Sequence, residues 1–119
     1  MSVENQDIER SHSIQLWEQL CDQIERECRS VNSVDRHRMI VERMPLDISI
    51  TDMNTRKLLR LSYQEKGPII NCHQTAKSDS SIAFRAEQDS ASSLTLVHRG
   101  IPQNPGALAV SLMIGLTRL

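Results

Sequence analysis

A chain of 119 residues is long enough for one domain and too short for a second independent core. Its 14 basic and 15 acidic residues give a net charge of -1, whereas general nucleic-acid binders carry a basic excess. The longest apolar stretch, residues 107–116, is about half the length of a membrane-spanning helix. These properties predict one soluble domain that binds neither nucleic acid nor membrane.

The cysteines and the N-terminus indicate a cytoplasmic protein. Cys21, Cys28 and Cys72 form an odd set, which is typical of free thiols in a reducing compartment. Residues 1–12 are polar and acidic, unlike a secretion signal or a transit peptide. We expect this segment to be partly disordered or the start of a helix, followed by a single α+β domain over residues 13–119.

Residues 14–31 are predicted to form an amphipathic helix. The apolar side chains recur at steps of three and four, which places them on one face. That stripe consists of Trp17, Leu20, Cys21, Ile24, Cys28 and Val31. Trp17 is one of only three aromatic residues, so we expect a mainly aliphatic core.

After residue 35 the apolar spacing changes to two, which is typical of half-buried strands. Leu46, Ile48 and Ile50 alternate with polar residues, and 37–44 is a further strand candidate. The other expected strands are 57–63, 68–74, 81–87 and 94–99. Because the connections are short, these strands predict an antiparallel meander of five to six strands.

One register of this meander keeps the apolar residues on a single face. Its three cross-strand rows are Ile48, Leu59, Cys72, Ile82 and His98; Leu46, Leu61, Ile70, Phe84 and Leu96; and Tyr63, Pro68, Ala86 and Leu94. A sheet with one apolar face must be covered, and the two helices are the available cover.

The segment 100–103 is expected to end the sheet, and a second helix follows it. Asn104 is a good N-cap, and Pro105 suits the first helical position. Residues 107–119 are apolar nearly all round. The predicted fold is therefore α+β, with an N-terminal amphipathic helix, the meander and a C-terminal helix, both helices packing on one sheet face.

The C-terminal helix also predicts assembly. Ala107, Ser111 and Gly115 are spaced by four, which lets another backbone approach closely. The surrounding apolar surface exceeds what one sheet contact needs, so a homodimer through this helix is expected. The alternative is a helix that its own sheet and the first helix cover completely.

The outer sheet face carries the candidate ligand-binding residues. They are Arg60, Asn71, His73, Arg85 and Arg99. Guanidinium and amide donors around a histidine can hold a carboxylate or a phosphate. The alternative is an ordinary solvated strand face, as antiparallel sheets commonly have.

An enzyme is the competing hypothesis, with Cys72 as nucleophile and His98 as base. The predicted register places them two strands apart, about 9.5 Å, too far for a direct hydrogen bond. No carboxylate falls on that face to orient the imidazole. Motifs for metals or cofactors are absent from the sequence, so neither is expected.

The function predicted from sequence is thus a non-catalytic binding or assembly module. Its ligand would be a protein partner or a small anion on the outer sheet face. The alternative is a small cysteine-dependent enzyme that uses Cys72 and His98.

Overall fold

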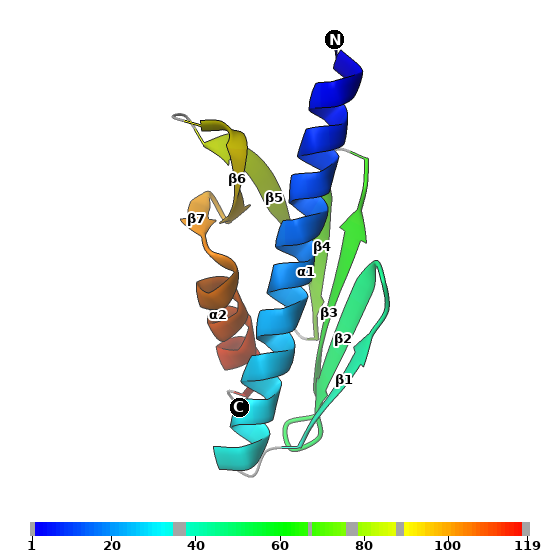
Figure 1. Ribbon diagram of the computed structural model, residues 1–119. Helices are drawn as coiled ribbons and strands as arrows, with labels where there is room; N and C mark the ends of the chain where they lie inside the picture. Colours follow the sequence, from blue (N-terminus) through cyan, green and yellow to red (C-terminus); the bar gives the residue numbers. More distant parts are fainter. Residues whose placement is uncertain (1, 35–37, 67, 76–78, 88–89, 118–119) are drawn as a thin grey trace.

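The computed structural model describes residues 2–34, 38–66, 68–75, 79–87 and 90–117 (Figure 1). The elements in chain order are α1 (Ser2–Val34), β1 (Met39–Arg43), β2 (Asp47–Asp52), β3 (Lys57–Gln64), β4 (Ile69–Gln74), β5 (Ser80–Glu87), β6 (Ser90–His98), β7 (Ile101–Gln103) and α2 (Pro105–Thr117). The predicted α+β fold, with a helix at each end of an antiparallel meander, is confirmed.

The sheet has seven strands in sequence order, each antiparallel to its neighbours. The extra strand is β7, in the segment where we expected the sheet to end. Arg99 and Gly100, with φ of 56° and 77°, form the two-residue turn that lets Ile101 pair with His98. Pro102 is tolerated in β7 because an edge strand has one side without ladder bonds.

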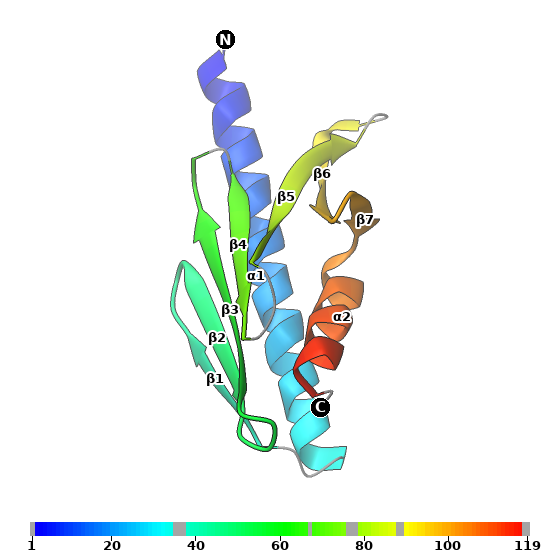
Figure 2. The ribbon, with the colours of Figure 1, turned by 180° about the vertical axis from the view of Figure 1, so that it is seen from behind.

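The first helix is longer than its apolar stripe predicts, since α1 begins at Ser2 rather than near residue 14. Figures 1 and 2 show its first turns projecting past the end of the sheet. Residues 2–12 are mostly polar and charged, with no stripe to pack on a sheet. Helix propensity and the continuation into a packed helix account for this extension.

Both helices pack on the same face of the sheet, as predicted (Figures 1 and 2). The sheet bends around α1, which contacts β1 at one edge and β6 near the other. The largest fully buried side chains come from both helices and five strands: Trp17, Leu20, Ile24, Ile48, Ile50, Leu59, Leu61, Ile70, Ile82, Leu96, Leu108 and Leu116. One aliphatic core therefore lies between the helices and the concave sheet face.

The predicted register has the right face for β2 to β6 but the wrong partners in three strand pairs. Leu46, which the prediction put on the core face, precedes β2 and is exposed. Ile48 lies opposite Leu61, Leu61 opposite Cys72, and Ile70 opposite Ile82. The pairing of Ile82 with His98 is confirmed. A two-residue slip leaves every side chain on its face, so apolar alternation cannot detect it.

All three aromatic side chains meet in one cluster. Trp17 stacks on Tyr63 at a centroid distance of 5.8 Å, and the half-buried Phe84 meets Tyr63 edge-on, also at 5.8 Å. The Tyr63 hydroxyl lies 2.7 Å from the Ser13 hydroxyl oxygen, inside the core. Aromatic pairs of this geometry add about 0.5–1.5 kcal/mol beyond burial. The cluster joins α1 to β3 and β5.

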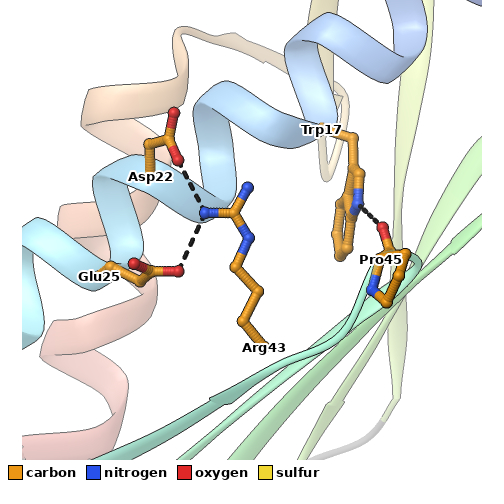
Figure 3. Close-up of polar contacts among 5 residues, drawn as sticks. All are labelled: Trp17, Asp22, Glu25, Arg43 and Pro45. Carbon is orange, nitrogen blue, oxygen red and sulfur yellow. Dashed lines mark hydrogen bonds and ion pairs between the residues drawn. The ribbon is translucent and has the colours of Figure 1, made fainter.

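Polar contacts tie the β1–β2 hairpin to α1 (Figure 3). The Trp17 indole N–H donates to the Pro45 carbonyl at 3.0 Å. Arg43 Nη1 donates to Asp22 at 2.7 Å and to Glu25 at 2.9 Å. Arg43 faces inward at the edge of the sheet, where a charged side chain discourages pairing with another strand.

Three contacts position α2. The Asn104 side chain accepts from the Ala107 N–H at 2.6 Å, which confirms the predicted N-cap. The Cys28 thiol lies 3.9 Å from the Met113 sulfur. Thr55 donates through its hydroxyl to the Leu116 carbonyl at 3.1 Å. The helix is held at its start, middle and end.

Replacing Leu61 by alanine tests the core. Leu61 is fully buried, so we expect Leu61→Ala to lower the free energy of unfolding by about 2–5 kcal/mol in urea titrations. The control is Ile40→Ala on the solvent-exposed side of β1, where the side chain is 43% exposed and the loss should be about 1 kcal/mol or less. Equal losses would contradict the assignment of the core face.

Candidate functional site

The main candidate site is a depression of about 490 Å³ on the outer sheet face, where β3 and β4 meet the start of β5. It is lined by Arg60, Ser62, Asn71, Cys72, His73, Asp79 and Ser80. Strand pairing builds it, since Arg60 lies opposite His73 and Ser62 lies opposite Asn71. Alternate residues of a strand point the same way, so these four side chains share the outer face.

Carboxylates accompany both basic side chains of the depression. Arg60 Nη2 lies 3.9 Å from the Asp47 carboxylate, and His73 Nδ1 lies 2.7 Å from Asp79 Oδ1. Asp79 was not among the predicted ligand-binding residues. Its position six residues after His73 could have indicated this contact, because a short connection between antiparallel strands brings the chain back beside the strand it left.

The five predicted ligand-binding residues fall in two groups. Arg60, Asn71 and His73 line the depression, whereas Arg85 and Arg99 are not among its lining residues. Arg85 lies opposite Thr95, four residues beyond Ser81, the partner of Asn71. Four residues along a strand span about 13 Å, so Arg85 is separate from the depression.

Arg99 belongs to the surroundings of the inner-face residues Cys72 and His98. It lies in the β6–β7 turn, where its positive charge opposes the burial that raises the pKa of Cys72 and adds to the burial that lowers the pKa of His98. Arg99 therefore affects the charge states of Cys72 and His98 on the inner face, although it does not line the depression.

A serine stands between the proposed nucleophile and base on the inner face. Ser80 lies opposite Cys72, and its hydroxyl oxygen is 3.3 Å from His98 Nε2. Burial raises the pKa of the Cys72 thiol, although a hydrogen bond with Ser80 and the charge of Arg99 oppose the shift. Burial and Arg99 lower the pKa of His98. These effects favour a neutral thiol and a neutral imidazole, which is unfavourable for thiolate chemistry.

Metal binding and membrane spanning both require features that can be sought in the described part of the chain. No group of three or more His, Cys, Asp or Glu side chains there could hold a metal ion. Among the described helices, none combines the length and the apolar character needed to span a bilayer.

Comparisons with protein-family models, with curated proteins and with solved structures found no match to this chain.

Alkylation of Cys72 tests whether its thiol is activated. A raised pKa means that the reactive thiolate forms only at alkaline pH, so we expect slow reaction with iodoacetamide at neutral pH. The reaction rate should rise only at pH values above those at which an ordinary thiol begins to react. Mass spectrometry of the Cys72 peptide would measure it, with the unfolded chain as control. Folded protein that reacts faster than unfolded protein at neutral pH would revive the cysteine-enzyme hypothesis.

Proposed function

We propose that this protein is a non-catalytic assembly module whose second helix, α2, docks against α2 of another copy. The observation that carries the proposal is the exposure of apolar side chains on α2. Val110 is 41% exposed and Ile114 is 46% exposed. No residue of the α2 segment Pro105–Thr117 is charged. A helix that is apolar all round is normally buried, so water contact on this face is unfavourable.

The two faces of α2 differ in what they contact. Leu108, Leu112 and Leu116 are buried on the side that meets α1 and β3. The opposite side exposes Ala107, Val110, Ser111 and Ile114. These four positions follow the i, i+3, i+4, i+7 spacing of one helix face. Covering it would remove apolar surface from water at roughly 25 cal/mol per Å².

The chemistry of this exposed face fits a second copy of the chain. Ala107 and Ser111 have small side chains that let another backbone approach closely, and the larger Val110 lies beside them on the exposed face. Packing of two such faces about a two-fold axis would set the larger side chain of each helix against the small residues of the other. Since no residue of α2 is charged, the contact between the two helices would bury no charge of α2 itself.

We also propose that the protein works in a reducing compartment such as the cytoplasm. Cys21, Cys28 and Cys72 are free and buried. Free thiols fit a reducing environment.

Sedimentation equilibrium tests the assembly. The mass of the wild-type chain should rise from monomer toward dimer as its concentration increases. Val110→Glu should keep the chain monomeric, because dimerisation would bury a charge without a partner. Ile40→Glu is the matched control, since Ile40 is similarly exposed, at 43%, on β1.

A second variant guards against misfolding of Val110→Glu. Ser111→Lys places a long charged side chain on the exposed face of α2 and should also prevent association, with circular dichroism unchanged. A wild-type chain that stays monomeric at the highest soluble concentration would refute the proposal. Association that both α2 variants preserve would place the interface elsewhere and refute it equally.

A further inference from the structure

We propose that the depression lined by Arg60, Asn71 and His73 is a binding site for a small ligand with a single oxyanion group, a carboxylate or a phosphate. This site is independent of the α2 face, because it lies on the outer side of the sheet and both helices pack on the inner side. Its volume of about 490 Å³ is typical of small-molecule sites.

Arg60 is the principal donor. Its side chain is 57% exposed, and its contact with Asp47 is long at 3.9 Å. Exposed ion pairs of this kind contribute little, so a ligand can compete for the guanidinium at small cost. Arginine offers a planar fork of N–H groups that matches two oxygens of one oxyanion.

Neighbouring strand positions supply the remaining donors. Ser62 and Asn71 lie opposite each other, and each is two residues along its strand from the Arg60–His73 pair. Their hydroxyl and amide groups can donate hydrogen bonds. All four positions are inside the β3–β4 ladder, which restrains the backbone. A site on paired strands holds its donors more accurately than a site on loops.

The depression also has depth. The inward-facing Cys72 and Ser80 contribute to its lining, together with the outer-face residues. Because Cys72 and Ser80 are paired across β4 and β5, a ligand would rest over this ladder on the outer side of the sheet.

Asp79 determines which oxyanions fit. Its carboxylate accepts the hydrogen of His73 Nδ1 at 2.7 Å, which orients the ring. Asp79 is 71% exposed, and its negative charge opposes that of a bound anion. One oxyanion group near Arg60 is compatible with this charge, whereas a polyanion extending toward Asp79 is repelled. The rest of the ligand should present hydroxyl or ammonium donors to Asp79.

NMR titration of the full chain tests the site, with acetate and inorganic phosphate as probes. Saturable shifts at β3 and β4 are expected with at least one probe, and the tighter one identifies a carboxylate or a phosphate site. Arg60→Gln should weaken binding about tenfold, as expected for loss of a charge-assisted hydrogen bond. Arg85→Gln is the matched control, because it removes the same charge from the same face outside the depression.

Three results would overturn the inference. Shifts that never saturate with either probe would exclude a site. Arg85→Gln weakening binding as much as Arg60→Gln would indicate general charge attraction. An Arg60→Gln chain that keeps its native spectrum and binds like the wild type would remove Arg60 from the site.

The role of Asp79 has a separate readout. Triphosphate should bind to the wild-type chain with lower affinity than phosphate. Asp79→Asn removes the repelling charge and should reduce the difference between the two affinities. Tighter binding of triphosphate to the wild type would contradict selection for a single oxyanion group. Neither experiment depends on the oligomeric state, so failure here and failure of the α2 assembly are distinguishable.

Discussion

Burial of the α1 stripe against the concave face of the sheet is the interaction on which the structure depends. A seven-stranded sheet with one apolar face needs cover along its whole width, and α1 runs along that face. Trp17, Leu20 and Ile24 are buried at this contact. The bend of the sheet lets a single helix touch strands near both edges.

The aromatic cluster and the Arg43 contacts locate this helix on the sheet. Hydrophobic burial is not directional and would tolerate sliding of α1 along the strands. The stacking of Trp17 on Tyr63 and the indole hydrogen bond to Pro45 are directional. Because α1 occupies the middle of the concave face, α2 lies beside it and contacts α1 and β3 along one side. The exposed apolar surface of α2 follows from that arrangement.

The outer face of the sheet is free of both helices (Figure 2) and carries the depression lined by Arg60, Asn71 and His73. Strand pairing brings Arg60 beside His73 and Ser62 beside Asn71, although each pair is separated by many residues in sequence. The inner face of the same strands is apolar and places Cys72 in a buried setting. One sheet thus separates a hydrated donor-rich surface from a thiol whose pKa burial raises.

The sequence by itself determined the fold class, the inner face of β2 to β6 and the start of α2. Periodicities of 3.6 and 2 are local properties, and the Asn104 cap acts within one turn, so no tertiary information is needed for them. Arg60, Asn71 and His73 were placed on one face for the same reason.

Only the tertiary structure decided the partners across the strands. Ile48 lies opposite Leu61, whereas the predicted partner was Leu59. A slip by two residues preserves the alternation, so turn geometry and packing on α1 decide between the two pairings. The β6–β7 turn depends on positive φ at Arg99, a residue type that gives no local signal for it. Register also places Arg85 four residues along β5 from Ser81, away from the depression. The β4–β5 connection brings Asp79 to His73. Neither placement can be read from residue spacing, because both depend on register and on the path of a connection.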